Sequence, residues 1–268
     1  MWDLTINLAA SAIAGLAVWL AQYALRRRRL ERKRKFFGLA KDAQCTFYVA
    51  RHASSPRVNS VHRLDMAALM ELSMIAGDCG SRPEIASFDD PPSGIGAATE
   101  FTVGGPGTNP RTSQHLRWLL PGVTAGEDGK ELLTIHVGDR AFSREAGVYE
   151  YVLLARVFPP NGGLPVFILY GQTAPTNQAA ARYLAERYSR LARDHADRAF
   201  CLMLRIVDPP AYGNSVIEFV ADVTAEALRP PAASAVAAAP AAASVSAAGS
   251  AATVIPQRDA PEQGKMKK

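Results

Sequence analysis

A glycine-rich turn at residues 104–109, GGPGTN, has the residue types best suited to ligand-binding chemistry. Its glycines permit tight turns and let a ligand approach the backbone closely. Thr108 and Asn109 follow and can cap a helix, and the N-terminal N–H groups of a helix attract phosphate or carboxylate groups. Glycines followed by helix-capping residues therefore predict a turn that binds an anion. The alternative is an ordinary strand-to-helix turn, because the spacing matches neither the Walker motif nor GxGxxG.

A second turn shows the same order of residues. VGGPGTNPRTSQHL and YGQTAPTNQAAARYL both run from a strand through Gly and Pro to Thr-Asn and then into a helix. Arginines near these turns suit bidentate contacts with phosphate. The predicted ligand-binding residues are Arg51, Gly104, Gly105, Gly107, Thr108, Asn109, Arg111, Thr176 and Asn177, and Arg57 is a further source of positive charge.

Carboxylates are the candidate catalytic residues. Glu71 and Glu100 could reach the same region and act as a nucleophile or base, although solvated surface carboxylates are the alternative interpretation. The five histidines and three cysteines lack metal-ligand spacing, and no GxSxG elbow is present. We therefore predict no metal and no cofactor, and the sequence leaves open whether the protein is an enzyme. Cys79 is interpreted as an ordinary free cysteine, the alternative being an exposed reactive thiol.

Alternating strands and helices would position these residues. Helices are predicted over residues 65–76, 108–120 and 176–194. The first is expected to pack by one face that carries Met66, Leu69, Met70 and Ile75, with its methionines in the core. Strands are predicted over residues 45–50, 84–88, 99–103, 132–137, 151–158, 165–170, 200–207 and 215–223. Asn161-Gly162 indicates an antiparallel hairpin within this series.

This alternation predicts the α/β class, with one open three-layer sheet that is mixed but mostly parallel. Ligands of such sheets bind outside the carboxyl ends of the strands. Residues 51–63, 104–112 and 171–178 would meet there. The layout resembles flavodoxin-like or Rossmann-like nucleotide-binding domains, and more loosely Toll/interleukin receptor domains and nucleoside deoxyribosyltransferases. That resemblance holds at the level of fold only, over about residues 45–120. It implies N-glycosidic chemistry on a glutamate, but no diagnostic motif carries a residue over.

An uncharged stretch at residues 4–25 is long enough for a membrane-spanning helix. Thr5, Asn7, Ser11 and Gln22 make it less apolar than a strong span, and a soluble helix is the alternative. We predict a transmembrane anchor at 1–25, a basic juxtamembrane helix at 26–40, a cytoplasmic α/β domain at 41–228 and a disordered tail at 229–268. The tail is nearly all Ala, Pro, Ser, Val and Gly at first, a composition with too little apolar surface to fold.

Positive charge is concentrated after this stretch. Residues 26–35 carry eight basic groups and one acidic group, or +7, so the remaining chain carries −2 of the total of +5. The asymmetry predicts a single-pass protein of the cell membrane with its N-terminus outside, and these residues would contact anionic lipid headgroups. It gives no indication of nucleic-acid binding, which needs charge spread over a folded face. Small residues in the anchor are compatible with homo-oligomers.

Three functions are compatible with these patterns. The first is a membrane protein whose cytoplasmic domain binds a small anionic ligand, most plausibly a nucleotide, in sensing or signalling. The second is an enzyme that acts on a nucleotide or its glycosidic bond at the same place. The third is a membrane-tethered interaction module without a small ligand.

Overall fold

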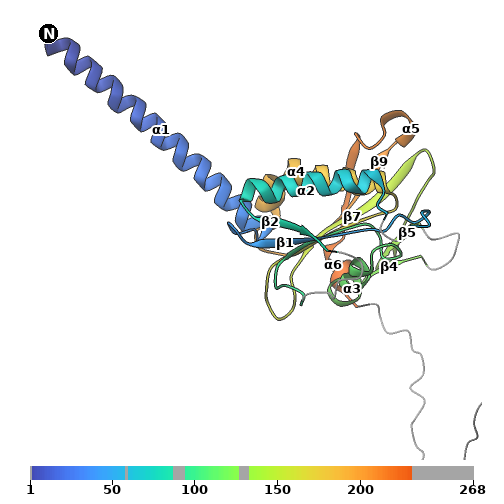
Figure 1. The fold of residues 1–268 in the computed structure, drawn as a ribbon. Coiled ribbons are helices and arrows are strands. Elements are labelled where there is room, and N and C mark those ends of the chain that lie inside the picture. Colours follow the sequence, from blue (N-terminus) through green and yellow to red (C-terminus); the bar gives the residue numbers. More distant parts are fainter. Residues whose placement is uncertain (1, 58–59, 87–93, 127–132, 231–268) are drawn as a thin grey trace, which may run out of the picture. The chain divides into compact units, whose positions relative to one another are not determined.

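The computed structural model describes residues 2–57, 60–86, 94–126 and 133–230 (Figure 1). The helices are α1 (Trp2–Phe37), α2 (Arg63–Cys79), α3 (Pro110–Leu119), α4 (Ala174–His195), α5 (Pro209–Tyr212) and α6 (Thr224–Leu228). The strands are β1 (Gln44–Val49), β2 (Arg82–Ile85), β3 (Thr99–Val103), β4 (Val123–Ala125), β5 (Thr134–Val137), β6 (Arg140–Ser143), β7 (Tyr149–Val157), β8 (Val166–Gly171), β9 (Phe200–Val207) and β10 (Ile217–Asp222).

Seven strands form one mixed sheet in the order β10-β9-β7-β8-β3-β1-β2. The pairs among β2, β1, β3 and β8 are parallel, whereas β8, β7, β9 and β10 pair antiparallel. The predicted mixed α/β sheet is therefore confirmed. The expectation that it is mostly parallel was too strong, because β7 inserts between β8 and β9. The predicted hairpin is present, with Leu154 opposite Leu169 across β7 and β8.

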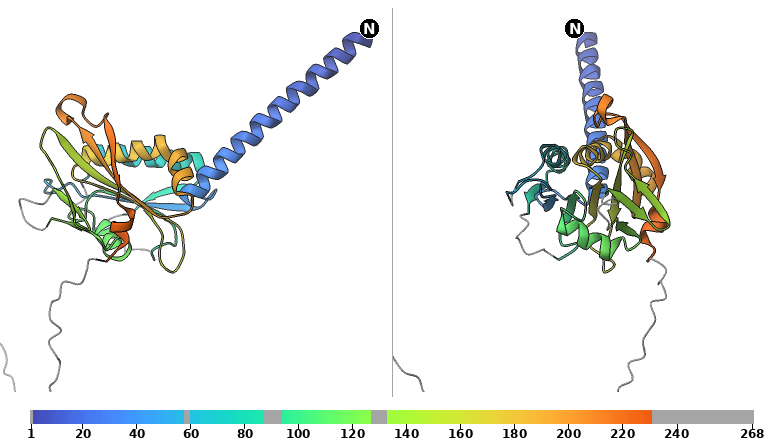
Figure 2. Two further views of the ribbon diagram at one scale, coloured as in Figure 1. Left: turned by 180° about the vertical axis from the view of Figure 1, so that it is seen from behind. Right: turned by 90° about the vertical axis from the view of Figure 1, so that its right-hand side faces the viewer.

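Helices cover both faces of this sheet (Figures 1 and 2). Successive side chains of a strand point to opposite faces, so Phe167 of β8 joins one core and Ile168 joins the other. The first core includes the buried faces of α2 and α4. The second includes α3, α6 and a small antiparallel sheet of β4, β5 and β6.

Helix α2 buries Leu69 and Ile75, as expected, but not the methionines beside them. Its core residues are Ala68, Leu69, Leu72, Ile75, Ala76 and Cys79. Met66 is 40% exposed and Met70 is 66% exposed, so the prediction that these methionines belong to the core was wrong. Leucine, isoleucine and alanine side chains together form the buried surface of α2. Cys79 is buried and burial raises the pKa of its thiol, which contradicts the alternative of an exposed reactive cysteine.

Short elements account for most of the differences from the prediction. The sequence did not indicate β4, β6, α5 or α6, each of which has five residues or fewer. Patterns this short carry too few residues to establish a period.

The tail was predicted at residues 229–268. Apart from its first two residues, it lies outside the described residues.

Residues 2–37 form a single helix, α1. Within the described residues, the structure contains no helix that is both long and apolar enough to cross a membrane. A helix is present at residues 1–25 from Trp2 onward, but the predicted membrane anchor is not found there.

Buried Arg156 of β7 joins the end of α1 to the end of α4. Its Nη1 donates to Phe36 O at 3.2 Å, and its Nη2 donates to Ala196 O and Arg198 O, both at 2.6 Å. The guanidinium also lies 4.4 Å from the Phe36 ring centroid. Burial lowers its pKa to about 10, so it stays charged at neutral pH and compensates the negative ends of both helices.

Arg156→Ala should lower the free energy of unfolding by about 3 kcal/mol or more, because one buried and two partly buried carbonyl groups lose a charged donor. Urea denaturation would measure this. Arg190→Ala is the matched control, since Arg190 is exposed and, in the described part of the chain, forms its ion pair with Asp194 one turn away. It should change stability by less than about 1 kcal/mol. Equal effects of the two substitutions would contradict the role assigned to Arg156.

Candidate functional site

A cavity of about 320 Å³ lies at the carboxyl ends of β1, β3 and β8. We call it the strand-end cavity. The three segments predicted to meet at this edge all line it, because parallel strands end on the same side of a sheet. Its lining residues are Ala50, Arg51, His52, Ala53, Ser54, His62, Asp65, Gly104, Gly105, Thr108, Gly171, Gln172, Thr173, Ala174, Pro175 and Asn177.

Gly104 brings the ends of β1 and β3 together beside this cavity. Its φ is +104°, and a Cβ at this position would lie 2.3 Å from the Cβ of Ala50. A side chain is therefore excluded by both backbone conformation and space. The glycine of this predicted turn is required for the local fold whether or not a ligand binds.

Asp65 and Asn177 join two helix N-termini at the cavity. Asn177 Nδ2 donates to Asp65 Oδ1 at 2.8 Å, and Asn177 Oδ1 accepts from Gly171 N at 2.8 Å. Asp65 lies in the first turn of α2 and is 4% exposed. Burial raises its pKa, against the opposing effects of Asn177 and of His62 and His52. A buried carboxyl group with a perturbed pKa therefore faces a cavity.

Two imidazole rings stand beside Asp65, with His52 and His62 centroids 5.4 Å apart. His62 Nδ1 accepts from Leu64 N at 3.2 Å and so caps α2. His52 Nδ1 accepts from Ser54 N at 3.3 Å. Because each Nδ1 is an acceptor, each neutral ring carries its proton on Nε2. The site thus combines imidazole donors with a carboxylate acceptor.

Five of the predicted ligand-binding residues line the cavity. They are Arg51, Gly104, Gly105, Thr108 and Asn177. The other four, Gly107, Asn109, Arg111 and Thr176, do not belong to its lining. The predicted loops meet at this cavity, but the sequence did not distinguish cavity-lining side chains from those that hold the loops in place.

Asn109 uses its side chain to build the loop. Its Oδ1 accepts from Arg111 N and Thr112 N, which caps α3, and its Nδ2 donates to Tyr48 O and Val103 O. These bonds occupy the N–H groups that the sequence suggested for a ligand. Asn109 is 1% exposed, so we assign it a structural role.

The two similar turns differ at the start of their helices. Asn109 is the N-cap residue of α3, whereas α4 is capped by Thr173, and Asn177 lies beyond its first turn. Thr176 Oγ1 donates to Thr173 O and accepts from Thr173 N, so it completes the capping box. Equivalent positions in the sequence therefore have different roles.

The two candidate catalytic glutamates lie away from the cavity. Glu100 accepts two bonds from Arg111, with Nε to Oε2 at 2.7 Å and Nη2 to Oε1 at 2.5 Å, in a buried pair. His115 Nε2 lies 2.8 Å from Glu100 Oε2. Glu71 faces Arg182, with Oε1 3.6 Å from Nε. Neither glutamate lines the cavity.

Sequence reasoning did not include Asp65 in the segments expected at this edge. It included His52, His62, Gln172 and Thr173 in those segments but did not single them out as site residues. The signal was present for Asp65, which follows a polar loop and opens a predicted helix. The position of Asp65 at the cavity became evident only from its contact with Asn177, which is 112 positions away in the sequence. Gln172 Oε1 accepts from Tyr151 N, and Thr173 Oγ1 bonds the buried Glu150 carboxylate. Such long-range partners cannot be read from local spacing.

No protein-family model, curated protein or solved structure matches this chain. The geometry supports a mixed α/β sheet domain with parallel core strands. In the part of the chain that the structure describes, no three His, Cys, Asp or Glu side chains are grouped to hold a metal ion.

Glu100→Gln should lower the free energy of unfolding by about 3 to 5 kcal/mol, because it leaves the Arg111 guanidinium buried without its counter-charge. Glu71→Gln should change it by less than about 1 kcal/mol, because its pair with Arg182 is partly exposed. Urea denaturation of both variants tests the assignment. A near-neutral effect of Glu100→Gln would contradict it.

Stability should also fall as the pH is lowered from 7 to 5. Burial lowers the pKa of His115, so below about 6.5 the unfolded chain binds a proton that the folded chain does not. The pKa of Glu100 is also lowered, because bonds from His115 and Arg111 outweigh the effect of burial, and its contribution is lost at still lower pH. Replacing His115 with Gln should reduce the slope of the free energy of unfolding against pH by up to about 1.4 kcal/mol per pH unit, as measured in denaturation curves. An unchanged slope would contradict this prediction.

Proposed function

We propose that the strand-end cavity binds a small anionic ligand, most simply a nucleotide, and that the domain acts in sensing or signalling. The observation that carries the proposal is the convergence of Arg51, His52, His62 and buried Asp65 on one cavity. Positive and hydrogen-donating groups suit phosphate, whereas a carboxylate accepts bonds from hydroxyl or amino groups. A nucleotide presents both kinds of group.

The position of the cavity supports this proposal. The parallel strands have the order β2-β1-β3-β8, which corresponds to the first four positions of a flavodoxin-like sheet. Ligands of such sheets bind where the order reverses, here between β1 and β3. The N-termini of α2 and α4 also reach the cavity and favour negative charge. Its volume lies near the lower end of the range of about 300 to 1,000 Å³ for ligand pockets.

A location at the cell membrane is the second part of the proposal. Basic residues 26–35 form the last turns of α1 before the domain, and an anionic lipid surface attracts such clusters. The domain would then lie beside the lipid headgroups. The orientation inferred from the charge asymmetry, with the domain cytoplasmic, stays a prediction.

A nucleotide-processing enzyme is the second candidate function, and the raised pKa of Asp65 favours it. A carboxyl group that protonates more easily than usual suits general acid–base chemistry. The catalytic candidate then becomes Asp65 in place of Glu71 and Glu100. An interaction module without a small ligand is the outcome if no ligand is found.

The test of binding is a thermal-shift screen of the full chain against nucleotides, cyclic nucleotides, dinucleotides and sugar phosphates. A ligand at 100 times its dissociation constant should stabilise the protein by about 2.7 kcal/mol. Arg51→Ala should raise the dissociation constant about tenfold or more, because a charged hydrogen bond is lost.

Arg57→Ala is the matched control for this test. Arg57 lies in the same loop and is exposed, but it does not line the cavity. It should change the dissociation constant by less than about twofold. A flat screen, or equal losses in both variants, would contradict ligand binding at the strand-end cavity.

Asp65→Asn separates binding from catalysis. The substitution keeps the shape of the side chain and an oxygen that can accept from Asn177 Nδ2. If the protein is an enzyme, product formation should fall by about a hundredfold or more while the ligand still binds. If the protein only binds its ligand, no product forms in either variant. Product formation unaffected by the substitution would exclude Asp65 as the catalytic group.

A further inference from the structure

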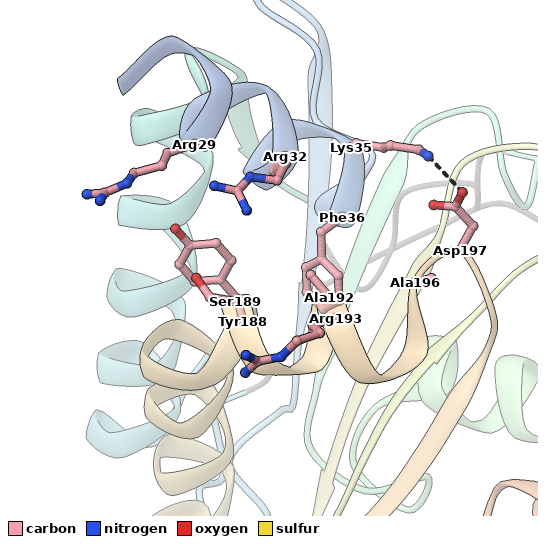
Figure 3. A pocket seen from close by; sticks show the side chains of 10 residues that line it. All are labelled: Arg29, Arg32, Lys35, Phe36, Tyr188, Ser189, Ala192, Arg193, Ala196 and Asp197. Atoms are coloured by element: carbon pink, nitrogen blue, oxygen red, sulfur yellow. Dashed lines mark hydrogen bonds and ion pairs between the residues drawn. The ribbon is translucent and has the colours of Figure 1, made fainter. Parts of the chain in front are cut away.

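A second cavity, of about 490 Å³, lies between the end of α1 and the C-terminal half of α4 (Figure 3). We call it the α1–α4 cleft. Arg29, Arg32 and Lys35 line it from α1, and Arg193 and Tyr188 line it from α4. Figure 3 shows these arginines flanking the Tyr188 and Ser189 side chains. The cleft is separate in sequence and in lining from the strand-end cavity.

The cleft carries more positive charge than its own carboxylate compensates. Lys35 Nζ pairs with Asp197 Oδ2 at 2.8 Å. Among the described residues, Arg29 and Arg32 form no ion pair, and Arg193 has only a long contact of 3.7 Å to Asp194. Guanidinium groups without a protein carboxylate are available for bidentate contacts with an oxyanion.

The end of α4 would ordinarily repel an anion, because helix C-termini carry partial negative charge. Here Arg156 donates to Ala196 O and Arg198 O, the carbonyl groups that follow α4. It also donates to Phe36 O at the end of α1. A buried cation thus compensates the partial negative charge of the two helix ends that border the cleft. The arginines that line the cleft therefore dominate its electrostatic potential.

The exposed apolar part of α1 ends next to this cleft. Trp19, Tyr23 and Leu25 are 59%, 55% and 54% exposed, and Arg29 follows one turn after Leu25. Aromatic residues next to a basic cluster are typical of the membrane interface, where lipid phosphates lie. We propose that the α1–α4 cleft is an anion site that binds a phosphate monoester group, from a lipid headgroup or from a soluble phosphate ester.

Vesicle co-sedimentation of the full chain tests the proposal. The vesicles contain phosphatidylcholine with either phosphatidic acid, which is a phosphate monoester, or phosphatidylserine at matched surface charge. The double variant Arg32→Ala/Arg193→Ala should bind the phosphatidic acid vesicles at least tenfold more weakly. Arg187→Ala/Arg190→Ala removes the same charge from exposed positions of α4 outside both the cleft and the basic cluster at residues 26–35, and should change binding less than about twofold.

Titration calorimetry with glycerol phosphate distinguishes the two sources. Binding of phosphatidic acid vesicles without binding of glycerol phosphate supports a lipid ligand, and the reverse supports a soluble ester. Equal loss in both double variants would show general electrostatic attraction and overturn the proposal. Absence of any preference for phosphatidic acid, together with no glycerol phosphate binding, would overturn it as well. Binding at the strand-end cavity is measured separately on the same variants and should be unaffected.

Discussion

The hydrogen bonds of Asn177 hold together the part of the protein on which the proposed function depends. Its Oδ1 fixes the end of β8 through Gly171 N, and its Nδ2 holds Asp65 at the start of α2. Parallel pairing of β1, β3 and β8 already places their ends at one edge. Asn177 then determines which carboxyl group faces the cavity, and its burial protects these bonds from water.

Other buried polar groups also hold helices and strands of the domain together. The pair of Glu100 and Arg111 ties α3 to β3, and Arg156 ties α1 to the end of α4. A buried charge is stable only when its partners satisfy it, so each of these groups permits few alternative arrangements. The strand-end cavity and the α1–α4 cleft are therefore both bordered by buried polar groups that form hydrogen bonds within the protein.

Apolar patterns in the sequence predicted strands of the main sheet, but they did not predict which side chains line the cavity. The span predicted for β3 was correct, as was that of β9, because short apolar runs between turns define buried strands. Spacing could not show that Asn109 and Arg111 bond inward while Arg51 lines the cavity, since the distinction arises from contacts with Tyr48 and Glu100. The face of α2 was only partly predicted, because Leu69 and Ile75 are buried as expected whereas Met66 and Met70 are exposed.

The most direct test of the account is an NMR titration of the histidine side chains with ATP, cyclic AMP, NAD and ribose phosphate as probes. Of the five imidazoles, only His52 and His62 line the strand-end cavity, and His115 and His136 provide internal references. At least one probe should shift the His52 and His62 signals at saturation and leave those of His115 and His136 in place. Unchanged His52 and His62 signals with every probe, or shifts confined to the reference histidines, would contradict a ligand site at the carboxyl ends of β1, β3 and β8.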